Sequence, residues 1–212
     1  MIENSIEIIE NSLQLSLLTI CAVLAGIYAF RNRDMNAGIL TMFFGSYVLG
    51  DIYWLLYRIY RGFTPYVFYV SDLSWYAAYL FLILILQRLA PEEERKTKHS
   101  ALWLLPVFTA GMAVFYLQWG DIFGNVATAV LMGMLLYCAV RGLVFIRSHP
   151  EALPRRMFYI SVIIFCAFEY LTWTASCFFW GDTLANPYYW LDFMVTLCAM
   201  LLLPAYRKAV EA

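Results

Sequence analysis

The stretch VLGDIYWLLYRIY, residues 48–60, decides the fold class. It lies in an apolar run, 37–60, that is long enough to cross about 30 Å of hydrocarbon as a helix. Yet it carries an aspartate, Asp51, and an arginine, Arg58, seven residues apart. Ionisable side chains inside a membrane are costly, so they are expected to face other helices or a water-filled cavity. The stretch therefore predicts a membrane helix that turns polar groups toward the interior of a bundle.

The whole chain follows this apolar pattern. Of its 212 residues, 63% are hydrophobic and 14% are charged, whereas about 25% are charged in a typical soluble domain. The alternation of polar and apolar residues typical of a membrane β-barrel is absent. We therefore expect an all-α polytopic membrane protein, a single membrane domain over residues 1–212. Its seven predicted spans are 13–30, 37–60, 66–89, 101–119, 122–146, 156–180 and 187–206.

The basic residues predict the orientation. Twelve of the 14 Lys and Arg residues fall at one set of alternating loops, and only Arg58 and Arg61 fall at the other. The positive-inside rule then places the N-terminus outside and the C-terminus in the cytoplasm. The first residues, MIENSIEIIENS, are acidic, which argues against a cleavable signal peptide. We interpret them as a short outer segment before the first span.

Cysteine and histidine give no sign of a metal or cofactor. All five cysteines lie inside predicted spans without the spacing of a metal site, so we interpret them as small hydrophobic side chains. The two histidines, His99 and His149, fall in cytoplasmic loops. We predict no metal, no cofactor and no nucleic-acid partner.

Four acids lie inside the predicted spans: Asp51, Asp72, Glu169 and Asp192. At 1.5 Å per residue, Asp72 and Asp192 lie about 8–9 Å below the outer ends of their helices. Asp51 and Glu169 lie about 14–17 Å below theirs. All four are therefore expected in the outer half of the membrane.

Aromatic residues share a helix face with each acid, because residues three, four or seven apart lie on the same side of a helix. This spacing predicts a ligand-binding set formed by Asp51, Trp54, Arg58, Asp72, Trp75, Tyr76, Glu169, Trp173, Tyr189 and Asp192. A purely structural role is the alternative, with Arg58 paired to Asp51 or, across the short turn, to Asp72. Four acids against one arginine favour a cation, a proton or a ligand that donates hydrogen bonds, and aromatic rings suit an amine or quaternary ammonium.

The order of acids indicates a duplicated plan. Residues 50–82 and 168–200 each carry an acid in one span and a second acid near the start of the next, 21 and 23 residues later. Matching the first span to the fifth gives a parallel 3-1-3 repeat. Ligand sites in membrane folds built from repeats tend to lie at the repeat interface.

Residues 49–86, LGDIYWLLYRIYRG…YVSDLSWYAAYLFLILIL, resemble the seven- or eight-helix sensor regions of bacterial membrane-bound diguanylate cyclases. The resemblance covers about 80 residues clearly, and it points to Gly50, Asp51, Trp54, Ser71, Asp72 and Trp75. It implies a bacterial plasma (inner) membrane location and a sensing role. No GGDEF or other output domain is found in the chain, which leaves three alternatives: signalling through a partner, a stand-alone relative with another role, or a fragment.

Two other classes stay open. The Gly-Asp pair and the helix count are also similar to lysoplasmalogenases, which implies a membrane hydrolase that acts on a lipid headgroup, with Asp51, Asp72, Glu169 and Asp192 as candidate catalytic acids. The repeat plan is similar to PQ-loop carriers, although no Pro-Gln pair occurs in any span.

Our interpretation is a membrane sensor with an outward-facing acidic and aromatic pocket. Its expected partners are the lipid bilayer, a small cationic or lipid ligand, and a cytoplasmic or membrane signalling protein. The cytoplasmic loops 88–100 and 146–156 are the expected docking surface for that protein, and the alternative is that they only set the topology.

Overall fold

A computed structural model describes residues 5–63 and 69–211. Within these residues the chain is helical and has no strand, and seven helices are long and apolar enough to cross a membrane. The expected all-α fold with seven candidate membrane helices is therefore confirmed.

The long helices are α1 (Ser5–Asn32), α2 (Met35–Arg61), α3 (Tyr69–Leu89), α5 (Leu104–Tyr116), α6 (Ile122–Ile146), α7 (Arg156–Phe178) and α8 (Pro187–Val210). Short helical turns connect them: α4 (Glu92–Arg95), η1 (Ser100–Trp103), η2 (Leu117–Trp119) and η3 (Pro150–Arg155). The predicted outer segment before the first span is part of α1, since this helix already begins at Ser5. Residues 66–68 of the predicted third span lie outside the described residues.

Capping residues explain several helix ends. The Asp34 carboxylate accepts hydrogen bonds from the backbone N–H groups of Asn36 and Ala37 at the start of α2. Gly62 ends α2 with φ of 75°, a left-handed conformation that glycine adopts without strain. Asn186 caps α8, and Pro187 occupies the first turn, where its missing N–H costs nothing.

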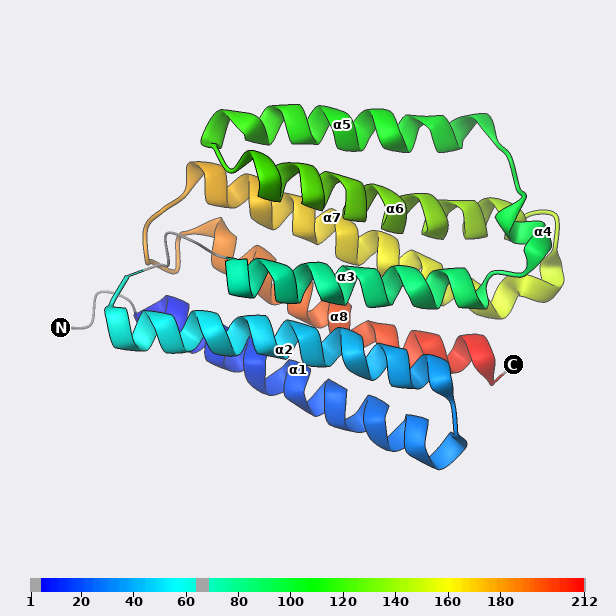
Figure 1. Ribbon diagram of the computed structural model, residues 1–212, viewed down its shortest axis with the longest axis horizontal. Helices are drawn as coiled ribbons and strands as arrows, with labels where there is room; N and C mark the ends of the chain where they lie inside the picture. Colours follow the sequence, from blue (N-terminus) through cyan, green and yellow to red (C-terminus); the bar gives the residue numbers. More distant parts are fainter. Residues whose placement is uncertain (1–4, 64–68, 212) are drawn as a thin grey trace.

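The helices form two rows that close on each other (Figure 1). One row is α1–α2–α3 and the other is α6–α7–α8, and the rows meet where α3 contacts α6 and α8 contacts α1. Helix α5 packs on α6 at the edge of the bundle. Each row is formed by three of the long helices that follow one another in the chain, and the 3-1-3 repeat stays a prediction.

Aromatic rings fill the centre between the rows. Tyr47 packs at ring-centroid distances of 5.8 Å on Phe43, 6.4 Å on Tyr79 and 6.3 Å on Phe165. All four rings are buried. These rings are therefore close-packed at the centre of the bundle.

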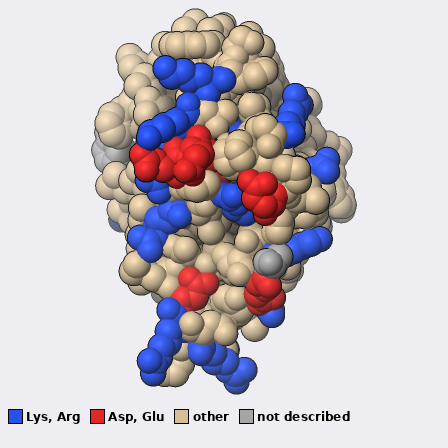
Figure 2. Space-filling view, turned by 90° about the vertical axis from the view of Figure 1, so that its right-hand side faces the viewer, with Lys and Arg blue, Asp and Glu red and all other residues tan. Residues whose placement is uncertain are grey.

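Basic and acidic side chains gather on the end of the bundle that holds the C-terminus (Figures 1 and 2). Here the fully buried Glu94 of α4 accepts hydrogen bonds from the Tyr159 hydroxyl, at 2.9 and 3.0 Å, and pairs with Arg155 at 3.0 Å. Burial raises the pKa of Glu94 above its ordinary value, and the Tyr159 and Arg155 contacts oppose that rise. This cluster fixes the loop after α3 to the start of α7.

The packing of Tyr159 against α6 can be tested by substitution. Gly142 of α6 lies against the fully buried Tyr159 ring, and a Cβ at position 142 would come within 2.4 Å of it. Gly142→Ala should therefore lower the free energy of unfolding by about 1–3 kcal/mol, the usual cost of overpacking. Denaturant unfolding in detergent measures the change. The matched control is Gly45→Ala on α2, where a Cβ meets nothing within 4 Å. Equal stability of the two variants would contradict the packing role of Tyr159.

Candidate functional site

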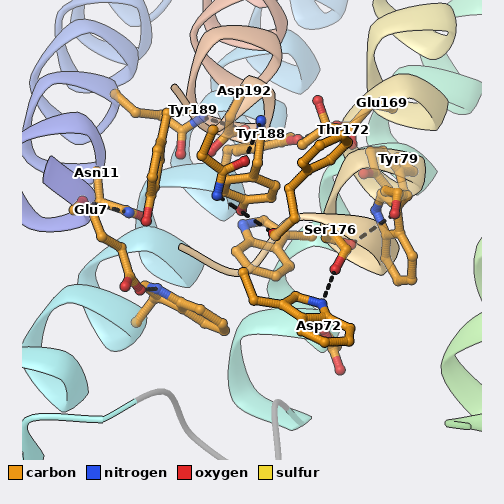
Figure 3. Close-up of a pocket in the computed structure, with 18 of the residues that line it drawn as sticks. Glu7, Asn11, Asp72, Tyr79, Glu169, Thr172, Ser176, Tyr188, Tyr189 and Asp192 are labelled. Atoms are coloured by element: carbon orange, nitrogen blue, oxygen red, sulfur yellow. Dashed lines mark hydrogen bonds between the residues drawn. The ribbon is translucent and has the colours of Figure 1, made fainter. Parts of the chain in front are cut away.

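A cavity of about 530 Å³ lies at the end of the bundle opposite the C-terminus (Figures 1 and 3). Its walls come from α1, α2, α3, α7, α8 and the α7–α8 loop. The lining residues are Glu7, Asn11, Gln14, Tyr47, Trp54, Asp72, Trp75, Tyr76, Tyr79, Glu169, Thr172, Trp173, Ser176, Phe179, Trp180, Asn186, Tyr188, Tyr189 and Asp192.

The structure brings most of the predicted binding set into this one cavity. The predicted residues that line it are Trp54, Asp72, Trp75, Tyr76, Glu169, Trp173, Tyr189 and Asp192. Asp51 and Arg58 belong to the same region but not to the lining. Both have other contacts, which explain how a membrane helix holds them.

Asp51 lies behind the cavity wall. Its side chain is 1% exposed, and its Oδ1 accepts a hydrogen bond of 3.2 Å from the Trp75 indole N–H. Gly50 permits this approach, since a Cβ there would lie 2.7 Å from the Trp75 Nε1. Trp75 in turn packs on Trp54, with ring centroids 6.1 Å apart. Asp51 therefore orients two aromatic rings of the cavity and does not itself line it.

Arg58 pairs with a residue that the sequence analysis placed in the outer segment. Its Nη2 lies 2.6 Å from the Glu7 Oε2, and the Trp54 indole N–H donates to the Glu7 Oε1 at 3.2 Å. The expected pairing of Arg58 with Asp51 or Asp72 is therefore not the one that forms. The physical reason is that α1 begins at Ser5 and runs beside α2, which places Glu7 within reach of Arg58.

The first turns of α1 supply polar groups that the sequence analysis did not assign to the site. Glu7, Asn11 and Gln14 line the cavity, and Glu10 is buried beside them. Gln14 donates hydrogen bonds of 2.9 Å to the Thr196 hydroxyl and 3.4 Å to the Asp192 Oδ1. Polar residues at positions 7, 10, 11 and 14 follow the helical period, so this spacing was the available signal.

The floor of the cavity is made of tyrosine and glutamate. The Tyr47 hydroxyl donates a short hydrogen bond to Glu169, which is 6% exposed. Tyr79 lies beside the same carboxyl group, and its ring packs on Tyr47 (Figure 3). Because Tyr47 and Tyr79 are also part of the central aromatic packing, the floor separates the cavity from the half of the bundle that holds the C-terminus.

The ionisable groups that line the cavity are acidic. Glu7, Asp72, Glu169 and Asp192 contribute carboxyl groups, and no Lys or Arg is among its described lining residues. Arg58 neutralises Glu7 from behind the wall. Among the residues that the structure describes, no group of three or more His, Cys, Asp or Glu side chains is arranged to hold a metal ion.

No protein-family model matches the chain, and neither the curated proteins nor the solved structures include a significant match to it. The sensor and lysoplasmalogenase resemblances therefore stay predictions from the sequence.

The contact between Asp51 and Trp75 gives a testable prediction. Trp75→Phe removes the indole donor and leaves the buried Asp51 without a hydrogen bond from this ring, so it should lower the free energy of unfolding by about 1–3 kcal/mol. Denaturant unfolding of Trp75→Phe, Asp51→Ala and the double variant measures the coupling. Trp103→Phe, at a 77% exposed tryptophan of η1, is the matched control. Strictly additive effects would show that the two side chains do not interact.

Proposed function

We propose that this chain is a membrane sensor whose outer cavity binds a small organic cation and which passes the signal to a partner protein. The main support for the proposal is that one cavity is lined by both carboxyl groups and aromatic rings, while no Lys or Arg is among its described lining residues. Such a cavity favours a positive ligand on electrostatic grounds.

The aromatic rings add to this preference. Trp54 and Trp75 lie 6.1 Å apart with planes inclined by 43°, and Tyr188 and Tyr189 lie 5.4 Å apart in an edge-to-face arrangement. A cation held over such rings gains about 0.5–2 kcal/mol, more when water is excluded. A cavity of about 530 Å³ falls within the usual range for small-molecule sites.

The closed floor supports binding over transport. Tyr47 and Tyr79 form the floor, and their rings pack on Phe165 beneath it. A carrier would need these buried rings to part. The lipid-hydrolase alternative needs acids that reach a substrate, and Asp51, one of its candidate acids, is held behind the wall by Trp75. These contacts favour a binding role.

Helix α7 offers a route from the cavity to the cytoplasmic loops. Its outer half carries Glu169 and Trp173 in the cavity, and its inner end begins at Arg156, beside the Glu94–Tyr159–Arg155 cluster. A ligand that shifts α7 would therefore act on α4 and η3, within the loops proposed as the docking surface. A signal of this kind requires that the ligand bind the two positions of α7 with different affinity.

A thermal-shift experiment tests the proposal. Tetramethylammonium and n-butylammonium should raise the unfolding temperature of the detergent-purified protein, and neutral n-butanol should not, because the cavity selects positive charge. At a concentration of 100 times Kd, a bound cation stabilises the folded state by about 2.7 kcal/mol. Asp72→Asn and Glu169→Gln should weaken the response.

The control for this experiment is Glu151→Gln, an exposed acid of η3 at the cytoplasmic end. It should respond like the unmodified protein. Equal shifts with the cations and with n-butanol would contradict the proposal, and so would cation shifts that survive both cavity substitutions. If lysolipids raise the unfolding temperature and are hydrolysed by the protein, the hydrolase alternative replaces the sensor proposal.

A further inference from the structure

Glu10 is a buried carboxyl group that neither the predicted binding set nor the cavity lining includes. It lies on α1 between Glu7 and Gln14, on the face turned toward the bundle. Its side chain is 9% exposed, and neither of its oxygens has a hydrogen-bond partner among the described residues. A buried acceptor with no donor is costly, so the group requires an explanation.

The acidic neighbours of Glu10 raise the free-energy cost of burying it as a carboxylate. Gln14, four residues after Glu10 on the same face of α1, donates to Asp192 of α8, which brings Asp192 close to Glu10. Asp51 of α2 and Glu7 of α1 lie within electrostatic reach of Glu10, and so does Tyr188 of α8. Glu169 of α7 lies within electrostatic reach of Asp192. Arg58, on α2, lies close to these acids and is paired with Glu7.

Two buried carboxyl groups at close range resolve this conflict by sharing a proton. A hydrogen bond between them forms only when one of the two is protonated, and the pair then carries one negative charge in place of two. The amide of Gln14 donates to the Asp192 Oδ1, which favours Asp192 as the charged member. Glu10, without a donor of its own, is then the member that holds the proton.

We propose that Glu10 and Asp192 form a carboxyl pair that shares one proton. When the pair binds the ammonium group of a primary-amine ligand, the proton shared by the two carboxyl groups is released to solvent. The inference rests on the proposed function, since it assigns the charged end of the cation to one wall of the cavity. Asp192 lines the cavity and presents the pair to the ligand. One proton leaves as one positive charge enters, so the net charge of the site is unchanged.

The Glu10 oxygens lack a hydrogen-bond donor among the described residues, and this favours a ligand that brings N–H donors of its own. A primary ammonium group carries three N–H donors, and it can donate to the Asp192 carboxylate in the cavity wall while its charge offsets that of Glu10 behind the wall. A quaternary ammonium carries none and interacts only through charge and with aromatic faces. The pair therefore selects primary ammonium compounds among the organic cations that the cavity admits.

Isothermal titration calorimetry tests the exchange. Binding of n-butylammonium near neutral pH is measured in two buffers of different ionisation enthalpy, which counts the protons released. The unmodified protein should release about one proton per ligand bound, because the pair changes from one bound proton to none. Glu10→Gln, which keeps the shape, should release none and bind at least tenfold more weakly. Glu93→Gln, at an exposed acid of α4, should behave like the unmodified protein.

Infrared spectroscopy of the ligand-free protein tests the pair separately. The carbonyl band of a protonated carboxylic acid should be present near neutral pH and should be reduced in Glu10→Gln but not in Glu93→Gln. An unchanged band in Glu10→Gln would overturn the inference, and so would binding of n-butylammonium without proton release. If no organic cation binds while the band still depends on Glu10, the proposed function and the ammonium role fail and the proton-sharing pair stands.

Discussion

The ion pair between Glu7 and Arg58 joins the start of α1 to the end of α2, and the wall of the cavity depends on it. The Nη2 of Arg58 lies 2.6 Å from the Oε2 of Glu7. The Trp54 indole donates to the same carboxylate. Because these contacts hold the first turns of α1 against the bundle, Asn11 and Gln14 become part of the cavity wall.

The surrounding acids show how the bundle manages carboxyl groups in an apolar setting. Asp51 receives an indole donor, Glu169 receives a tyrosine hydroxyl, and Asp192 receives an amide. Each donor comes from a different helix than its acceptor, so the same bonds that lower the cost of burial also tie the helices together. Glu10 departs from this pattern, because neither of its carboxyl oxygens has a hydrogen-bond partner among the described residues.

The two ends of the bundle differ in what surrounds their buried acids. The end that holds the C-terminus buries Glu94 against Tyr159 and Arg155. The opposite end surrounds its acids with a cavity. Between them the ring packing of Phe43, Tyr47 and Phe165 keeps the two polar regions apart. A binding event at one end can reach the other only through movement of whole helices, since a close-packed core is not continuously deformable.

The sequence by itself determined the all-α class, the seven candidate membrane helices and the residue types of the cavity. Length and apolar content fix the helices, and helical spacing puts Trp54, Trp75 and Trp173 on the faces of the acids. Only the tertiary structure decided which partner each charge takes. Whether Arg58 meets Asp51 or Glu7 depends on how α1 lies beside α2, and spacing within one helix carries no information on its neighbour. For the same reason Asp51 lies behind the wall while Asp192 lines it.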